Sequence, residues 1–192
     1  GKQTPKIIGV VPARMAASRF PGKPLYEIAG RPMLDHCYLR GRLFNQWDEY
    51  LIATCDDEIG KFAQDNSYPW VMTSDKHTRA LDRVAEAVEL CQATVGDNDI
   101  VICVQGHEPL LHPEMIEAVT NPLIDDDNLN GTMLTVPIIE EEFYRNPDIV
   151  KIVHDRQGFV LYTSRSPIPY CKEFSSELGA KRVGGIFGFR WK

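Results

Sequence analysis

Two short, continuous apolar runs constrain the fold of this chain more than any other feature. They are KIIGVV at residues 6–11 and DIVICVQG at 99–106. Strands of a parallel sheet read this way when they are buried on both faces. Helical patterns and further strand patterns alternate with them, the helices at 31–44, 56–66, 81–93 and 113–121 and the strands at 49–54 and 70–72. This alternation predicts βαβ units and a mainly parallel α/β sheet.

The pattern changes after an acidic, turn-rich loop at 124–131. Strand-like stretches follow with little helix between them, at 131–138, 148–155, 158–164 and 184–190. The tetrapeptide DRQG at 155–158 predicts a hairpin turn. We therefore expect one domain over 1–192, with a βα part at 1–123 and a β-rich, partly antiparallel extension at 131–192 that adds strands to the first sheet.

Composition narrows the class of protein. A chain of 192 residues that is 43% apolar is long enough for one well-buried core. The formal net charge of -6 and the lack of a broad basic patch argue against nucleic acid as a partner. The five cysteines form no CxxC pair, which indicates reduced thiols rather than a disulfide frame or a zinc site.

The N-terminal residues and the length of the apolar runs indicate the cellular compartment. No apolar run is long enough to span a bilayer, and the N-terminal residues lack a signal-peptide core. We therefore expect a cytoplasmic protein without membrane insertion. The chain starts at Gly1 rather than Met and stops in a strand-like stretch, so we expect it to be part of a longer polypeptide.

The loop after the first apolar run carries three cations. The stretch VVPARMAASRFPGKPL at 10–25 contains Arg14, Arg19 and Lys23 among small residues. In open α/β sheets, ligands lie beyond the carboxyl ends of the strands, where this loop begins. Small residues allow backbone N–H groups to approach an anion. Three cations with such donors match a triphosphate, which needs charge-assisted contacts.

A tight turn would bring these cations together. Pro21 and Gly22 suit the central positions of a type II turn, which would direct Lys23 back toward the two arginines. The loop is not a P-loop, because Ala17 and Pro24 occupy the places of the required glycine and hydroxyl residue. The alternative for each single cation is an ordinary solvated surface charge.

At this point the sequence resembles a known family. The loop resembles the signature loop of the sugar-activating cytidylyltransferases, and most closely that of the 3-deoxy-manno-octulosonate (Kdo) cytidylyltransferase, or CMP-Kdo synthetase, family. The likeness continues in order through GRPMLDH, IATCDDEI, VMTSDKHTRALDRVAEA, VICVQGHEPLLHPEMI, MLTVPI, NPDIVKIVHDRQGFVLYTSRSPIPY and GGIFGFR. It covers nearly the whole chain.

The resemblance implies a fold and a reaction. The fold is a Rossmann-like, three-layer α/β/α nucleotidyltransferase fold, and the second part of the chain binds the sugar and forms a homodimer. The anomeric hydroxyl of a 3-deoxy-2-ulosonic acid attacks the α-phosphorus of CTP, and pyrophosphate leaves with the assistance of Mg²⁺. The product serves lipopolysaccharide or other surface-glycan synthesis. Such chemistry depends on positioning and on charge neutralisation.

The resemblance also assigns residues. The catalytic cations Arg14, Arg19 and Lys23 would hold the β- and γ-phosphates and the departing pyrophosphate. The nucleotide site would further include Pro12, Ala13, Ser18, Arg79, Asp82 and Gln105. Arg165, together with Gln105, would meet the sugar acid, since a guanidinium binds a carboxylate in bidentate fashion. An ordinary surface or capping role is the alternative for each of them.

The chain departs from the family pattern at three places. TRALDR at 78–83 replaces a small, hydroxylated stretch, and Arg79 offers a donor there instead. His107 stands where the family has the aspartate expected to bind magnesium, and imidazole is a poor ligand for this hard ion. Val183 and Phe187 replace a histidine and a tyrosine of the family, so two polar groups toward the sugar are lost. The family's C-terminal acidic segment is absent from the sequence.

These departures leave three hypotheses open. The leading one is CTP-dependent activation of Kdo. The second keeps the chemistry but changes the sugar, for example to 8-amino-Kdo or another ulosonic acid. In the third, the protein binds nucleotide with little catalytic activity.

Overall fold

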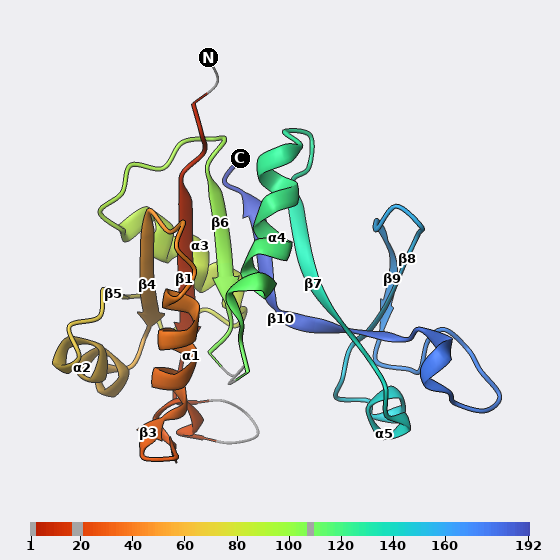
Figure 1. The fold of residues 1–192 in the computed structure, drawn as a ribbon. Helices are drawn as coiled ribbons and strands as arrows, with labels where there is room; N and C mark the ends of the chain where they lie inside the picture. The colour runs from red at the N-terminus through yellow and green to blue at the C-terminus, as the bar shows by residue number, and fades with distance from the viewer. Residues whose placement is uncertain (1–2, 17–20, 107–109) are drawn as a thin grey trace. The chain divides into compact units, whose positions relative to one another are not determined.

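The computed structural model describes residues 3–16, 21–106 and 110–192 (Figure 1). The chain divides into two compact units. One unit comprises Gly1–Thr132 and Gly185–Lys192, and the other comprises Met133–Gly184. Residues 185–192, which the sequence pattern groups with the β-rich part, pair within the sheet of the first unit. The reason is the length of the last strand, which runs from one unit into the other.

The first unit is built on a sheet with four neighbouring parallel strands. Its strand order is β5-β4-β1-β6-β10, and β10 is antiparallel to β6. The strands are β1 Ile7–Ala13, β4 Glu49–Thr54, β5 Trp70–Met72, β6 Ile100–Val104 and β10 Lys181–Arg190, the last from Gly185 onward. The predicted mainly parallel sheet is confirmed.

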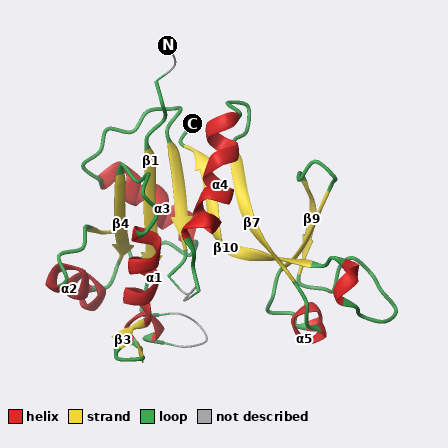
Figure 2. Ribbon diagram, in the orientation of Figure 1, coloured by secondary structure: helices red, strands yellow, loops and turns green. Residues whose placement is uncertain are grey.

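Helices cover both faces of this sheet, which confirms the three-layer prediction (Figure 2). They are α1 Met33–Arg42, α2 Asp57–Asp65, α3 Ala80–Leu90 and α4 Pro113–Asp125. Helix α3 lies on one face, and α1 and α4 lie on the other (Figure 1). Helix α2 packs closely against the edge strand, because a Cβ at Gly60 would lie 2.6 Å from the Trp70 ring.

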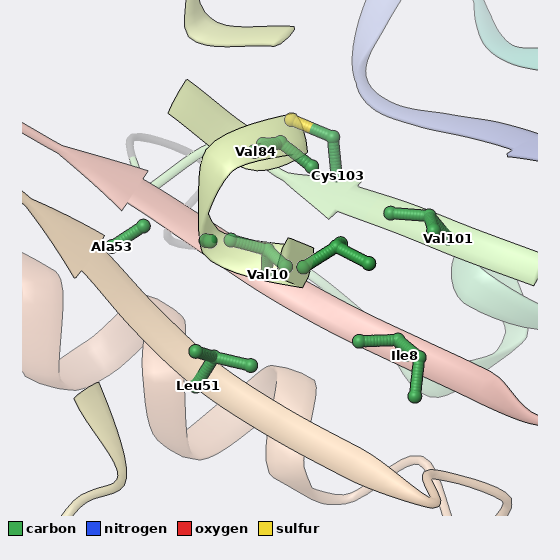
Figure 3. Close-up of a cluster of buried hydrophobic side chains, with 9 residues drawn as sticks. Ile8, Val10, Leu51, Ala53, Val84, Val101 and Cys103 are labelled. Atoms are coloured by element: carbon green, nitrogen blue, oxygen red, sulfur yellow. The ribbon is translucent and has the colours of Figure 1, made fainter. Parts of the chain in front are cut away.

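The core beneath α3 explains the two apolar runs (Figure 3). Its buried residues come from β1, β4, β6 and α3, namely Ile8, Val10, Leu51, Ala53, Val84, Ala87, Val88, Val101 and Cys103. Alternate residues of β1 point to this face, and Val11 on the opposite face is equally buried. All five cysteines are free, and burial raises the pKa of the Cys103 thiol to about 12. The buried Cys103 therefore acts as a small apolar group.

Helix α4 runs four residues beyond the predicted end at 121. It continues past Pro122 because Leu123 is fully buried and packs in the core. The Arg190 guanidinium donates to the Leu123 carbonyl (2.6 Å) and to the Asp126 carbonyl (3.1 Å), which satisfies acceptors at the helix end. A cation from the last strand thus stabilises the C-terminus of α4.

A short hairpin between β1 and α1 was not predicted from sequence. It consists of β2 Glu27–Ile28 and β3 Arg31–Pro32, which pair antiparallel. Its two turn residues, Ala29 and Gly30, both have positive φ, of 53° and 81°. Such a turn matches the twist of paired strands, and its usual sequence has Asn, Asp or Gly before the glycine. Alanine stands at that position here, so the sequence did not indicate the turn.

The second unit is built mainly from strands. It holds β7 Gly131–Pro137 from Met133 onward, β8 Lys151–His154, β9 Val160–Ser164 and the start of β10, with the short helices α5 Glu141–Arg145 and η2 Ser176–Leu178. Strand β8 pairs antiparallel with β9 and with the start of β10. The predicted DRQG hairpin is confirmed, with Asp155 N–H donating to the Phe159 carbonyl (2.8 Å) and Gly158 at a φ of 93°. A small core of Ile138, Tyr144 and Ala180 lies beside the helices.

No helix in the described part of the chain has the length and apolar character needed to cross a membrane.

Candidate functional site

The four parallel strands of the first unit end along one edge of the sheet. Ala13 at the end of β1 lies opposite Thr54 of β4, which lies opposite Met72 of β5. On the other side, the backbone beyond β6 approaches β1, since a Cβ at Gly106 would lie 3.8 Å from the Pro12 carbonyl oxygen. The loops after these strands therefore share one edge, which is where open α/β sheets bind ligands.

The described parts of the cation loop are fixed by hydrogen bonds. Met15 N–H donates to Asp56 Oδ2 (2.7 Å), just beyond β4, and Gly22 N–H donates to the Met15 carbonyl (2.8 Å). Gly22 has φ 78° and ψ 3°, the conformation of the third residue of a type II turn, as predicted. Lys23 follows directly and begins a short 3-10 helix, η1 Lys23–Leu25. The predicted site residues Ser18 and Arg19 lie outside the described residues.

The Arg14 guanidinium lies between the cation loop and the segment before α3. It is exposed, and it donates to the Ala16 carbonyl (2.9 Å) and to the His77 carbonyl (3.4 Å). Within 3–16, 21–106 and 110–192, no carboxylate forms an ion pair with Arg14 or Lys23. Both positive charges are therefore available to an anion at this edge of the sheet.

Helix α3 holds the segment that faces Arg14. The buried Arg83 guanidinium donates to Thr73 Oγ1 (2.8 Å) and to the Ser74 carbonyl (3.0 Å). The Glu86 carboxylate accepts from Ser74 N–H (3.1 Å) and contacts the His77 ring. The His77 ring, and then Ser74 N–H, lower the pKa of Glu86. Residues 73–77 are thus fixed to α3 by two of its side chains.

The other predicted nucleotide residues of this unit lie at the same edge. Arg79 is the N-cap of α3, and Asp82 lies in its first turn; both are exposed. Gln105 comes directly after β6, is half-buried, and donates its N–H to the Gly185 carbonyl (2.9 Å). Pro12 and Ala13 close β1. Arg83, the neighbour of Asp82 in the DR dipeptide, has a structural role instead.

The predicted metal position is not among the described residues, since His107 lies outside them. In the described part of the chain, no three His, Cys, Asp or Glu side chains gather to hold a metal ion. Mg²⁺ is commonly bound by substrate phosphates and waters with only one or two carboxylates. The described residues thus provide no preformed cage for the ion.

The predicted sugar-binding arginine lies in the second unit. Arg165 follows β9, is exposed, and donates from Nη1 to the Pro147 carbonyl (3.2 Å). Val183 belongs to the same unit and donates its N–H to the Val150 carbonyl (2.8 Å). Phe187 belongs to the first unit, where it pairs with Cys103 and packs against the core beneath α3.

Two residues at the site were missed from sequence. Asp56 fixes the cation loop through Met15, and Glu86 fixes residues 73–77. Asp56 could have been found, because an acid directly after a buried strand lies at the ligand-binding edge. Glu86 carries no such signal, since it sits in the middle of an amphipathic helix.

A family model for cytidylyltransferases matches residues 8–192. Among curated proteins, the chain is 39% identical over 186 residues to a protein from Oleidesulfovibrio alaskensis named 3-deoxy-manno-octulosonate cytidylyltransferase, covering 96% of this chain and 73% of the relative. It is 41% identical over 190 residues to a protein of the same name from Nitrosococcus oceani, covering 94% and 72%.

Solved structures show the same likeness. A structure described as CMP:2-keto-3-deoxy-manno-octonic acid synthetase complexed with CTP matches with a TM-score of 0.84 at 33% identity, covering 97% of this chain and 74% of that one. A 4-diphosphocytidyl-2C-methyl-D-erythritol synthase matches with a TM-score of 0.62 at 13% identity, covering 99% and 77%. The second likeness concerns the fold alone.

Proposed function

The chain belongs to the cytidylyltransferase family, and we propose that it transfers CMP from CTP to the anomeric hydroxyl of 3-deoxy-manno-octulosonate (Kdo), releasing pyrophosphate. The observation that carries this proposal is the position of the cation loop. Arg14 and Lys23 come after the first parallel strand, and neither forms an ion pair with a carboxylate among the described residues. They lie at the edge of the sheet where open α/β folds bind nucleotides.

The loop cations stabilise the negative charge of the phosphates. In the proposed complex, Arg14, Lys23 and Arg19 bind the β- and γ-phosphates and take up the charge that develops on the departing pyrophosphate. Preorganised cations act best where charge grows in the transition state, because they need no rearrangement during the reaction. Asp56 and the Gly22 turn fix the described parts of the loop, at Met15 and Gly22, before the substrate arrives.

The remaining nucleotide contacts come from loops at the same edge. Pro12, Ala13 and Ser18 offer backbone contacts to the nucleotide, while Arg79 and Asp82 lie at the start of α3, on the side proposed for the base. Gln105, which follows β6, would contact the nucleotide and the sugar. Arg165 binds the sugar carboxylate, a task suited to a planar guanidinium.

Magnesium is the proposed cofactor, and it would neutralise phosphate charge when bound. The donors described in this chain form no cage for it, so phosphate oxygens would be its main ligands. His107, at the family's aspartate position, is the one protein ligand we propose, although imidazole suits this ion poorly.

We further propose a cytoplasmic homodimer. Strand β9 exposes three consecutive apolar residues, Val160 (52% exposed), Leu161 (66%) and Tyr162 (59%). Exposed apolar surface of this kind marks protein interfaces, and two-fold dimers are the commonest oligomers. The β-rich unit therefore supplies the proposed dimer contact.

A second candidate keeps the chemistry but changes the sugar. Val183 and Phe187 have replaced two polar residues of the family pattern, and Phe187 packs against an apolar core. Another ulosonic acid, for example one with an altered substituent such as 8-amino-Kdo, is therefore the second candidate.

A panel of substrates tests the proposal. Pyrophosphate release is measured with CTP and Mg²⁺ and with Kdo, 8-amino-Kdo or another ulosonic acid in turn. Turnover with Kdo supports the first candidate, and turnover with another ulosonic acid alone supports the second. Nucleotide binding without turnover of any sugar would mean a nucleotide-binding protein and would overturn both.

A further inference from the structure

A lysine is fully buried in the second unit. The Lys151 side chain, on β8, has 0% of its surface exposed. Its Nζ donates to the Asn146 carbonyl (2.6 Å), and no carboxylate forms an ion pair with it in the described parts of the chain. Burial, and then the positive charge of Arg165, lower the pKa of Lys151.

Lys151 and Arg165 are fixed to consecutive peptide groups. Lys151 Nζ donates to the Asn146 carbonyl, and Arg165 Nη1 donates to the next carbonyl, that of Pro147 (3.2 Å). The strands add a second link, since Lys151 lies opposite Ser164, the residue just before Arg165. The position of the 146–147 backbone thus sets where the exposed guanidinium stands.

The turn that carries these carbonyls is shaped by bonds that are local in sequence. Asn146 N–H donates to the Glu142 carbonyl (3.0 Å), and Ile149 N–H donates to the Asn146 carbonyl (3.1 Å). The Asn146 side chain accepts from Asp148 N–H (2.8 Å). These bonds set the shape of the turn itself. Lys151, which stands in a strand, fixes the turn to the sheet.

An apolar side chain would fill the place of Lys151 at lower cost. Burying a cation without a carboxylate partner costs free energy that one carbonyl contact offsets only in part. The lysine therefore contributes something other than packing, and the geometry offers one answer, the placement of Arg165.

We propose that Lys151 is a positioning residue for Arg165, fixing the 146–147 turn so that the guanidinium stands ready for the carboxylate of the sugar acid. The inference rests on the proposed function, in which Arg165 binds that carboxylate. Lys151 does not touch the substrate, because its side chain is enclosed. It acts through Asn146 and Pro147.

The first test separates the two substrates. Lys151→Met and Lys151→Gln are compared with wild type in pyrophosphate release, and Lys172→Met, an exposed lysine of the same unit, is the control. Lys151→Met is expected to raise KM for the sugar acid about tenfold, the scale of one weakened charge-assisted contact, and to leave KM for CTP unchanged. An equal rise of both KM values, or no rise for the sugar acid, overturns the proposal. Should the methionine variant not fold, the glutamine variant is judged by the same criteria.

The second test needs no turnover. The ¹⁵N resonance of Arg165 Nε–Hε is assigned by its loss in Arg165→Lys and then recorded in the Lys151 variants without substrate. We expect it to shift in Lys151→Met and to stay in place in Lys172→Met. An unmoved resonance overturns the positioning role. A wild-type protein that turns over no ulosonic acid would instead contradict the proposed function, so the two failures are distinguishable.

Discussion

At the scale of single residues, charge and partner decide what each side chain can do. Arg14 and Arg83 lie near the same sheet edge. Arg14 is exposed, and its hydrogen-bond partners among the described residues are carbonyl groups. Arg83 is buried and donates to Thr73 and Ser74. The sequence predicted the first role from the loop. It could not separate Asp82 from Arg83, because a dipeptide does not reveal which side chain points inward.

Lys23 is the described loop cation that most directly tests the triphosphate site. Lys23→Ala is expected to lower kcat/KM for CTP about 100-fold, the loss that follows removal of one preorganised charge contact. Steady-state kinetics with varied CTP would measure it, with Lys172→Ala as the exposed control. Arg19→Ala should behave in the same way. Unchanged kinetics in both variants would remove the triphosphate from this loop.

His107 bears on the proposed magnesium contact. Histidine supplies no negative charge to the ion, so a carboxylate in its place should strengthen metal-dependent catalysis more than nucleotide binding. His107→Asp is expected to raise the turnover rate at limiting Mg²⁺, measured beside wild type across a magnesium titration. A slower aspartate variant would show that the metal contact has been misplaced.

At the scale of elements, α3 sets the geometry of the nucleotide edge. Its Glu86 carboxylate fixes residues 73–77, and the His77 carbonyl accepts from Arg14. The sequence predicted α3 as a helix over residues 81–93. The role of Glu86 could not be predicted, because it depends on how the preceding segment folds back over the helix.

The Glu86 contacts predict a loss of stability at acid pH. The pKa of this carboxyl is lowered in the fold, so its stabilising contribution is present above its unfolded pKa and is lost as pH falls through the folded value. Glu86→Gln should therefore lower the melting temperature at neutral pH and flatten its fall on acidification. Thermal unfolding from about pH 7 to about pH 3, a range that spans ordinary carboxyl pKa values, measures both. A variant that melts like wild type at every pH would show that Glu86 contributes nothing to the fold.

At the scale of the whole molecule, local pattern predicted most elements and missed what depends on long-range pairing. Continuous apolar runs gave β1 and β6, and helical spacing gave α1 to α4. The partners of the last strand were not predicted, since β10 pairs with β6 in one unit and with β8 in the other. Residues 185–192 therefore belong with the first sheet, which no local signal in GGIFGFR indicates.

The proposed dimer makes a prediction at this scale. Leu161 is 66% exposed on β9, so a charge there should disturb an interface but not the core of the unit. Leu161→Glu is expected to convert the dimer into a monomer, as measured by light scattering at micromolar concentration. The monomeric variant should still unfold in a cooperative thermal transition, which would show that its core is intact. Lys172→Glu, at an exposed residue of the same unit outside β9, is the comparison. A wild-type protein that is already monomeric would contradict the dimer.

The proposed transfer of CMP to a sugar acid can be followed by ³¹P NMR of one reaction mixture. Protein, CTP, Mg²⁺ and Kdo are incubated and followed over time, with a matched sample that lacks the sugar. We expect the triphosphate signals of CTP to decline while a phosphodiester signal and pyrophosphate grow in equal amounts, only when the sugar is present. Pyrophosphate growth without the phosphodiester, or unchanged CTP with Kdo and every other ulosonic acid, would contradict the proposed transfer.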